Sequence, residues 1–447
     1  MTGRTAWRAG TAPRRLPYAL VAAAAIVPRL AVLLHERGTI TAAYVDKSDV
    51  FARTFLAHGT YGFIPGRPSA YTQPLYGWFL IPLYWIFAHS WIVVGLAQIA
   101  VAAATALLVY EIGRRWLSPL AGLLAALAAT LHPYLVWHDV HMNREILDEL
   151  LAAAIVLLTL LVLDKRSLPL ALALGAVLGL AILGNVRLVL LPLVVAAFLV
   201  AVRRRVLVMP ALAALVAVAV VVSPWVVRNR VSVGCTTLTT DGRALWKANN
   251  PNTLRTLEHG KWIDDVPPIP GTPPTPQDAG AIYASTGRVV PTNECAQMRY
   301  YRHLAVRFME HHPGEKAKLA GVAARMLWQP AVTRTEGRRG AGTSLDVGRR
   351  VVEPAFVIVL YALGLVGLFL VPRRLAALAL LLLAYNTLAA MLFAGETRYR
   401  VPWDFVIALS AAAAVTRILA LIGRGPVQER PVEDLRPVGR AGLEKVH

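Results

Sequence analysis

The sequence predicts an all-α polytopic membrane protein, and three observations support this prediction. The 447 residues are 56% hydrophobic and only 16% charged, whereas an ordinary soluble domain carries about 25% charged residues. The mean hydropathy is +0.53, and the apolar residues form blocks of about 18 or more, the length of a membrane-spanning helix. A soluble core could not bury so many apolar side chains at this chain length. The composition therefore excludes a soluble enzyme, a disordered tail protein and a disulfide scaffold.

Ten segments are predicted to span the membrane as helices. Several arginines precede the first segment and place the N-terminus inside, because basic residues concentrate in cytoplasmic loops. This first segment resembles a signal peptide without a convincing cleavage site, and we interpret it as an uncleaved span. The ten spans are roughly 17–34, 92–112, 119–136, 146–163, 168–185, 188–202, 207–227, 354–371, 375–394 and 401–422.

Basic clusters fix the predicted topology. When the spans alternate, every predicted inner connection holds a compact group of basic residues, and both termini lie inside. These groups explain part of the net charge of +20, which comes from 46 basic and 26 acidic residues. No nucleic-acid partner is therefore expected. The groups are Arg114 and Arg115, Lys165 and Arg166, Arg203 to Arg205, and Arg373 and Arg374.

The topology divides the chain into five parts. An apolar segment at 74–91, rich in Trp and Tyr, is either an eleventh span or a juxtamembrane or re-entrant helix. Its aromatic residues favour the interface, and an additional span would break the alternation of the basic clusters. The parts are a basic cytoplasmic N-terminus (1–16), an N-terminal transmembrane module (17–227) with a first outer loop (35–91), an extracytoplasmic loop subdomain (228–353), C-terminal transmembrane helices (354–422) and a cytoplasmic tail (423–447).

Both cysteines, Cys235 and Cys295, lie in the predicted extracytoplasmic loop subdomain. Disulfides form in exported segments, so two cysteines confined to one such loop suggest a bond between them. The alternative is a pair of free buried thiols.

Acidic residues mark two places on the predicted outer side. Asp46 and Asp49 lie three apart in YVDKSDVFARTFLAHG, on one face of a short amphipathic helix that ends at His58 and Gly59. The apolar side of this helix is predicted to hold Val50, Phe51, Phe55 and Leu56. The two aspartates are either site residues or an N-cap and a first-turn acid.

The second acidic group follows the third span in HDVHMNREILDELL and contains Asp139, Asn143 and Glu145. Glu145 lies about one turn inside the start of the next span, where an ionisable group is costly and usually functional. The alternative is a solvated helix start with acids at its positive end. That alternative suits Asp139 better than Glu145.

Arginines occur in three predicted outer connections, against the usual charge bias of membrane proteins. Arginine suits phosphate because its fork is planar and always charged, and these residues flank apolar spans. We therefore expect a lipid-linked phosphate ligand, with general binding of anionic lipids as the alternative. The residues are Arg187, Arg228 and Arg230, and Arg398 and Arg400, which flank Tyr399.

The sequence shows no HExxH motif or Cys/His array for a metal, and no Walker or GxGxxG loop for a nucleotide. Several stretches follow one another along the chain: the acidic first outer loop, then AYTQPLYGWFLIPLYWIFAHSW, LLVYEIGRRWLSPLAGLLAALAATLHPYLVWHDVHMNREILDELL, SPWVVRNR, LWKANNP and ETRYRVPW. They cover most of the membrane part, and in this order they resemble the membrane glycosyltransferases with the GT-C fold, in particular glycosyltransferase family 39. That family includes the protein O-mannosyltransferases and the aminoarabinose transferase of lipid A.

The resemblance implies a GT-C-like bundle of about 10–11 transmembrane helices and a catalytic aspartate in the first outer loop. Asp46 or Asp49 is then the base, with Asp46 preferred. Glu145, Asn143 and Asp139 are implied to position the acceptor or the sugar. Ligands for the lipid phosphate are implied to be Arg187, Arg228, Arg230, Arg398, Tyr399 and Arg400.

The implied reaction is inverting transfer of a sugar from a polyprenyl phosphate to a glycan, lipid or protein acceptor. The expected location is a bacterial plasma membrane, with the active site on the extracytoplasmic face. No cofactor or metal is expected, because Lys47 and Ser48 separate the two aspartates, unlike the DxD pair of metal-dependent oligosaccharyltransferases.

A transporter or flippase of lipid-linked sugars or other anionic lipids is the alternative. Outer arginines alone would suit it. A transporter should place charges near the bilayer midplane, however, and the candidate residues here gather on one predicted face.

Overall fold

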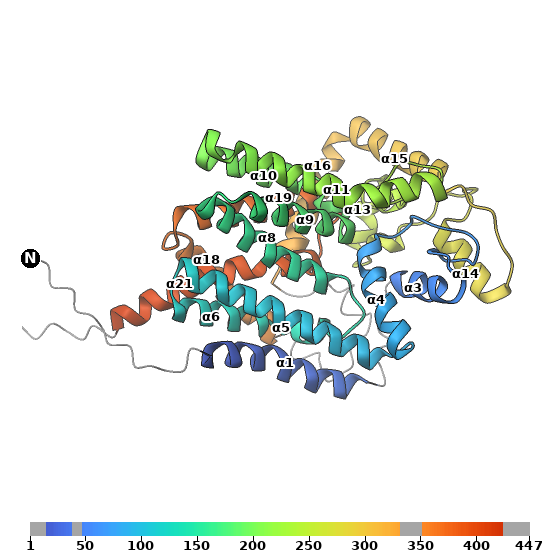
Figure 1. The fold of residues 1–447 in the computed structure, drawn as a ribbon. Helices are drawn as coiled ribbons and strands as arrows, with labels where there is room; N and C mark the ends of the chain where they lie inside the picture. The colour runs from blue at the N-terminus through green and yellow to red at the C-terminus, as the bar shows by residue number, and fades with distance from the viewer. Residues whose placement is uncertain (1–14, 38–46, 331–350, 423–447) are drawn as a thin grey trace, which may run out of the picture.

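The computed structural model describes residues 15–37, 47–330 and 351–422. Long helices lie side by side in a bundle, and shorter helices gather at one end of it (Figure 1). Outside the helices, the described residues include one isolated antiparallel bridge, between Ile64 and Arg67. The predicted fold class, an all-α polytopic membrane protein, is confirmed.

Helices occur at all ten predicted spans. Within the described ranges, seven stretches are long and apolar enough to cross a membrane. The other three spans correspond to the shorter apolar helices α6 (Pro119–Thr130), α9 (Leu168–Gly184) and α18 (Glu353–Leu368). The seven stretches contain α1 (Leu16–Glu36), α5 (Trp91–Trp116), α8 (Glu145–Lys165), α10 (Leu191–Arg203), α11 (Val208–Ser232), α19 (Arg373–Leu392) and α21 (Asp404–Ile422).

The third predicted span, 119–136, is shorter in the structure than in the prediction. Helix α6 stops at Thr130, and a separate short helix, α7 (Pro133–His138), follows. His132 has φ −55° and ψ 121°, outside the helical region. A residue before proline is pushed out of the α conformation by the proline ring, so Pro133 explains the break.

The aromatic segment after the first outer loop forms α4 (Pro74–Phe87), 14 residues long. At about 1.5 Å per residue such a helix is roughly 21 Å long, shorter than the hydrocarbon core of about 30 Å. This length favours the juxtamembrane or re-entrant interpretation over an eleventh span.

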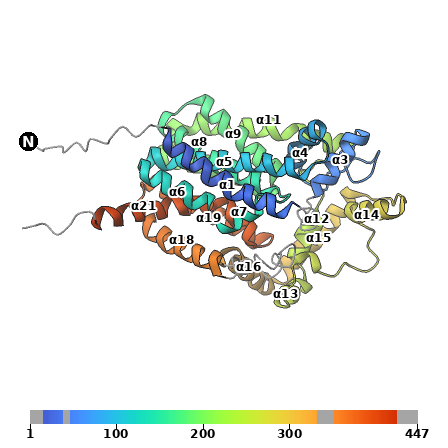
Figure 2. The ribbon, with the colours of Figure 1, turned by 90° about the horizontal axis from the view of Figure 1, so that it is seen from below.

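The turns predicted to face the cytoplasm meet at one end of the bundle. Trp116 at the end of α5 donates to Asp164 of α8 at 2.9 Å, and Arg374 at the start of α19 lies 3.7 Å from Asp164. Helix α1 begins and α21 ends at this same end (Figures 1 and 2). The side-chain contacts therefore agree with the alternation predicted from the basic clusters.

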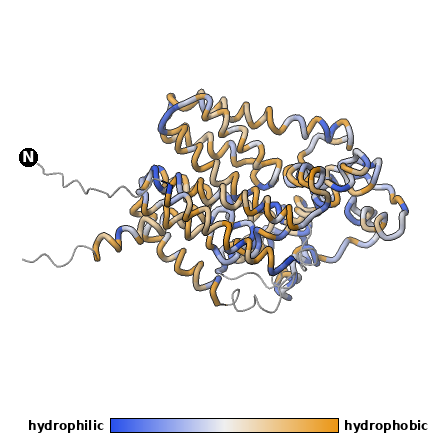
Figure 3. Tube along the Cα trace, turned by 60° about the horizontal axis from the view of Figure 1, so that its bottom comes forward, coloured by the Kyte–Doolittle hydropathy of each residue, from blue (hydrophilic) through white to orange (hydrophobic). Residues whose placement is uncertain are grey.

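The opposite end carries α3 (Lys47–His58), α4 and the helices of the predicted loop subdomain at 228–353, which we call the second outer loop (Figure 1). The bundle helices are mostly hydrophobic along their length, and hydrophilic residues are more frequent in the segments at this end (Figure 3). The second-loop helices are α12 (Gly242–Ala248), α13 (Pro251–Glu258), α14 (Pro276–Thr286), α15 (Glu294–His311) and α16 (Pro313–Trp328).

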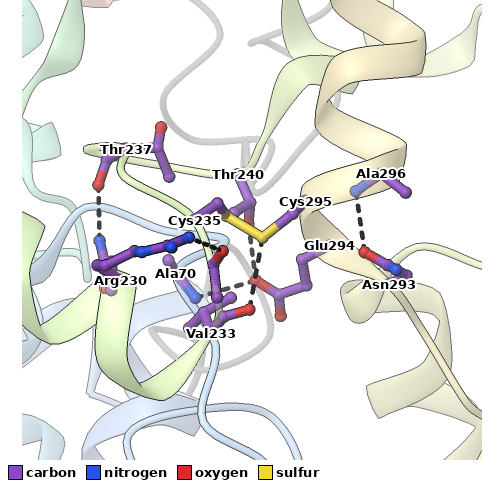
Figure 4. Close-up of a disulfide and its surroundings, with 12 residues drawn as sticks. Ala70, Arg230, Val233, Cys235, Thr237, Thr240, Asn293, Glu294, Cys295 and Ala296 are labelled. Atoms are coloured by element: carbon purple, nitrogen blue, oxygen red, sulfur yellow. Dashed lines mark hydrogen bonds between the residues drawn. A yellow bond between two sulfur atoms is a disulfide. The ribbon is translucent and has the colours of Figure 1, made fainter.

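A disulfide joins Cys235, just after α11, to Cys295 in α15, with 5.8 Å between the Cα atoms (Figure 4). Beside it, the buried carboxylate of Glu294 accepts hydrogen bonds from the Ala70 amide at 3.0 Å and the Thr240 hydroxyl at 2.7 Å. Ala70 belongs to the first outer loop. The two outer loops are therefore tied to each other, and a site at this end can draw residues from both.

Candidate functional site

Ionisable side chains gather where α8 begins, at the end of the bundle that is predicted to face outward. Glu145 is the first residue of α8 and is buried. Its amide donates to the Asn143 carboxamide oxygen at 2.7 Å, so Asn143 satisfies one of the free amides at this helix start. Neighbouring Arg144 lies 3.8 Å from Glu145 and donates to Gln73, just before α4, at 2.6 Å.

Arg187 enters the same region from the short 3₁₀ turn Val186–Leu188 that links α9 to α10. The Asn185 side chain accepts from the Arg187 amide at 3.2 Å and donates to Asp148 of α8 at 2.9 Å, which fixes the turn against α8. The Arg187 guanidinium donates to the Ala394 carbonyl at 3.1 Å and lies 3.9 Å from the centre of the Tyr399 ring.

Arg187 keeps one nitrogen available. Its NH1 atom is shielded from solvent and has no hydrogen-bond partner. Among the described residues, no ion pair joins Arg187 to a carboxylate, whereas Arg144 has Glu145 and Arg398 has Glu396. Burying a guanidinium nitrogen without a partner is costly, so this atom is suited to an incoming anion.

The third contribution comes from the segment 393–400, between α19 and α21. Glu396 is buried and lies 2.5 Å from Arg398, whose guanidinium donates to the Tyr399 hydroxyl at 3.0 Å. Asn386 of α19 donates to the Tyr399 carbonyl at 2.9 Å and holds the backbone of the segment.

Burial raises the pKa of Glu396 above its ordinary value, Arg398 opposes that change, and the charges of Glu145 and Asp264 add to it. Glu396 therefore lies within electrostatic reach of both the start of α8 and the second outer loop. We call Arg144, Glu145, Arg187, Glu396, Arg398 and Tyr399 the arginine cluster.

Three of the predicted phosphate ligands make their contacts elsewhere. Arg228 donates to the carbonyls of Ser69 at 2.8 Å and Tyr61 at 3.0 Å, and so anchors the loop between α3 and α4. Arg230 is exposed and donates to the Gly234 carbonyl at 3.0 Å (Figure 4). The structure therefore does not bring these two side chains to the arginine cluster.

The third is Arg400, which is fully buried. It pairs with Asp404 at 3.0 Å and donates to the carbonyls of Leu327 and Gln329 at 3.1 and 2.8 Å. These bonds fix the start of α21 against the end of α16.

Asp139 pairs with an arginine that the sequence reasoning missed. Arg29, inside α1, lies 2.7 Å from Asp139, and both side chains are buried. The signal was a lone arginine within a predicted span, which in a membrane protein needs a partner. One oxygen of the Asp139 carboxylate accepts a hydrogen bond from Arg29 of α1, and the other oxygen has no hydrogen-bond partner.

The predicted amphipathic helix of the first outer loop is α3, which begins at Lys47 and is followed by Gly59 at φ +66°. Phe51 is buried as predicted, but Phe55 and Leu56 are 40% and 37% exposed. The buried face instead includes Asp49, because neighbouring polar side chains donate hydrogen bonds to its carboxylate.

Three donors surround the Asp49 carboxylate. The Tyr84 hydroxyl and His89 Nε2 each lie 2.8 Å away, and Arg53 Nε lies 3.0 Å away. Tyr84 and His89 come from α4 and the connection after it, and sequence reasoning did not link them to Asp49. Asp46 lies outside the described residues.

The described residues contain no group of three or more His, Cys, Asp or Glu side chains arranged to hold a metal ion.

Comparison with known proteins supports the architecture. A family model described as dolichyl-phosphate-mannose-protein mannosyltransferase matches residues 67–227. The chain also resembles the oligosaccharyltransferase of Archaeoglobus fulgidus tethered to an acceptor peptide, at 12% identity and a TM-score of 0.55 over 93% of this chain and 51% of that one. The same enzyme, AglB, with an inhibitory peptide and a dolichol-phosphate gives 13% identity and a TM-score of 0.53, over 93% of this chain and 52% of that one.

A further similarity is to ArnT from Cupriavidus metallidurans bound to undecaprenyl phosphate, at 16% identity and a TM-score of 0.42, over 95% of this chain and 82% of that one. No curated protein sequence matches. The chain spans about half the length of the oligosaccharyltransferases whose fold it shares. The predicted resemblance is confirmed for the fold: the chain has the GT-C fold of these membrane proteins, and residues 67–227 match the mannosyltransferase family model.

Proposed function

We propose that the protein is an inverting glycosyltransferase that moves a sugar from a polyprenyl phosphate to an extracytoplasmic acceptor. The observation that carries this proposal is Arg187, which presents a shielded nitrogen without a partner or a carboxylate at the outer end of the bundle. The matching family is described by its dolichyl-phosphate-mannose donor, and a protein of the same fold is described in complex with a dolichol-phosphate.

The arginine cluster would bind the phosphate of the donor. Arg187 provides the unpaired NH1 atom, and Tyr399 packs beneath its guanidinium at 3.9 Å. Arg398, already paired with Glu396, would share its charge with the phosphate when the donor is present. Hydrogen-bond donors preset in this way act most strongly where negative charge develops, here on the departing phosphate oxygen.

We assign the role of base to Asp46, because the Asp49 carboxylate already accepts from three donors. In the proposed step, the acceptor hydroxyl oxygen attacks the anomeric carbon of the sugar and transfers its proton to Asp46. The bond between that carbon and the phosphate oxygen breaks, and its electron pair leaves with the polyprenyl phosphate. A single displacement of this kind inverts the anomeric configuration. We propose that it needs no resident metal ion.

Glu145 and Asn143 would position the sugar or the acceptor beside the phosphate. Glu145 shares its region with Arg144 and Glu396, and Asn143 fixes the backbone at the start of α8. Asp139, held by Arg29, would act more remotely through the same loop.

We place the site on the extracytoplasmic face of a bacterial plasma membrane. Support comes from the basic turns, which gather at the opposite end of the bundle, as expected of a cytoplasmic face. The disulfide between Cys235 and Cys295 also suits an exported segment.

Purified protein in nanodiscs tests the function directly. A panel of polyprenyl-phosphate sugars, including mannose and arabinose donors, is offered with glycan, lipid and peptide acceptors, and released polyprenyl phosphate is quantified. We expect release with one donor class, together with a product of inverted configuration. Folded protein that releases nothing but moves a labelled donor between leaflets would contradict the proposal and support the flippase alternative.

The assignment of Asp49 makes a separate prediction. Asp49→Asn keeps the shape of the side chain but removes the charge that Arg53 and His89 contact. We expect the apparent melting temperature to fall, because a hydrogen bond to a charged group contributes about 1.5–3 kcal/mol, and we expect activity to fall about tenfold, without being lost. Thermal unfolding and polyprenyl phosphate release are measured together, with Ser48→Ala as the neighbouring buried control. Complete loss of release in stable protein would make Asp49 the base.

A further inference from the structure

Two residues of the second outer loop form hydrogen bonds with the end of α19, which leads into the arginine cluster. Lys316 of α16 donates through Nζ to the carbonyls of Met391 at 2.7 Å and Leu392 at 3.3 Å, the last two residues of α19. Asn249, just after α12, donates to the same Leu392 carbonyl at 3.0 Å and accepts from Lys316 at 2.5 Å. The last carbonyls of a helix have no partner within it and favour a cation, so Lys316 caps α19.

The capped helix end leads directly into the segment that carries Arg398 and Tyr399. Arg187 donates to Ala394 in this segment, and Gly395 packs so tightly on α16 that a Cβ atom there would lie 1.7 Å from the Ala323 carbonyl oxygen. A displacement of the end of α19 would therefore move both the carbonyl that orients Arg187 and the backbone that carries Arg398.

A small pocket lies between α13, α16 and the end of α19. Its lining includes Lys316 together with Phe393, Ala394 and Gly395, and also Trp262. Lys316 therefore lies beside the segment that follows α19 as well as against the carbonyls at the end of that helix.

We infer that Lys316 is a positioning residue for the proposed transfer: its ammonium group fixes the end of α19 and thereby the geometry of Arg187 and Arg398 toward the donor phosphate. This inference rests on the proposed function. Lys316 itself need not touch the donor, because its three acceptors all belong to the protein.

The charge on Lys316 is sensitive to mild alkali. Its partners are neutral oxygens, and burial lowers its pKa to about 8. Two charged side chains on α16 and α12 pair elsewhere, Glu315 with His312 and Lys247 with Asp264. The last two turns of α19, from Tyr385 to Leu392, contain no charged residue. The cap is therefore charged below this pKa and weakens as the pH rises through it.

Two substitutions of Lys316 separate the effect of its charge from the effect of its side-chain size. In Lys316→Met we expect the KM for the donor to rise about tenfold at pH 7, because a hydrogen bond from a charged donor is lost, with a smaller change in kcat. In wild type we expect the same KM to rise between pH 7 and pH 9.5. Lys316→Arg, whose charge persists throughout this range, should keep the KM constant. An unchanged KM in Lys316→Met, or the same alkaline rise in Lys316→Arg, would overturn the inference.

Hydrogen–deuterium exchange tests the positioning without any substrate. Amides of residues 393–399, corrected for intrinsic exchange, should exchange about tenfold faster in Lys316→Met than in wild type, in line with the loss of one charged hydrogen bond. Asn249→Ala, which removes only the second contact to Leu392, should give an intermediate rate and serves if Lys316→Met does not fold. Unchanged exchange in both variants contradicts the inference. Faster exchange in an enzyme that releases no polyprenyl phosphate from any donor would support the positioning role and reject the proposed function.

Discussion

Replacing Asp46 by asparagine is expected to reduce release of polyprenyl phosphate by about 100- to 10,000-fold, the range that general base catalysis contributes. The amide keeps the shape of the carboxylate but cannot accept the proton of the attacking hydroxyl. Donor binding should change little, because the ligands that we propose for the donor phosphate are side chains of the arginine cluster. The measurement is release from the active donor in nanodiscs, with donor KM and kcat determined separately.

Two controls make this result interpretable. Equal membrane insertion and thermal stability of Asp46→Asn would show that the loss is chemical, and Asp46→Glu should recover part of the activity because it restores a carboxylate. Asp49→Asn, measured in parallel, should keep roughly a tenth of wild-type release, since the loss of one charged hydrogen bond costs about tenfold. Wild-type release by Asp46→Asn would remove this residue from the mechanism.

The membrane makes much of this fold predictable from sequence. A span needs a long apolar block because no backbone group can remain unsatisfied in lipid, and basic residues mark the cytoplasmic turns. These two rules place helices at every predicted span and bring Trp116, Asp164 and Arg374 to one end. Pro133 also indicates that α6 ends early, at Thr130. The predicted span ran past this point because it was drawn from the apolar residues alone.

The site is less predictable because its pairings connect distant segments. Asp139 pairs with Arg29 of α1, 110 residues earlier in the chain, and Asp49 accepts from Tyr84 and His89. Sequence spacing shows that a buried charge needs a partner but not which residue provides it.

The outer arginines show the same limit. Arg187, Arg228 and Arg400 looked equivalent as basic residues beside apolar spans. Backbone carbonyls bind Arg228, and the Asp404 carboxylate neutralises Arg400, whereas Arg187 has an unpartnered nitrogen and no ion pair among the described residues. Only the three-dimensional accounting of hydrogen bonds separates a structural arginine from one that is available to a ligand.

This difference leads to the second large expected effect. Arg187→Met should reduce kcat/KM for the donor by roughly 100- to 1,000-fold, the loss typical when one preset donor to a developing negative charge is removed. Arg187→Lys should recover only part of this loss, because a lysine cannot both donate to the Ala394 carbonyl and reproduce the planar fork.

The matched control is Arg302→Met, which replaces an exposed arginine on α15. It should leave kcat/KM within about twofold, as expected for surface substitutions. Donor titrations and release rates are compared at low and high salt, since a shielded arginine–phosphate contact is screened less than an exposed one. If Arg187→Met and Arg302→Met behave alike, the unpaired nitrogen of Arg187 does not serve the donor, and the phosphate must be bound by Arg144 or Arg398 after release of their carboxylate partners.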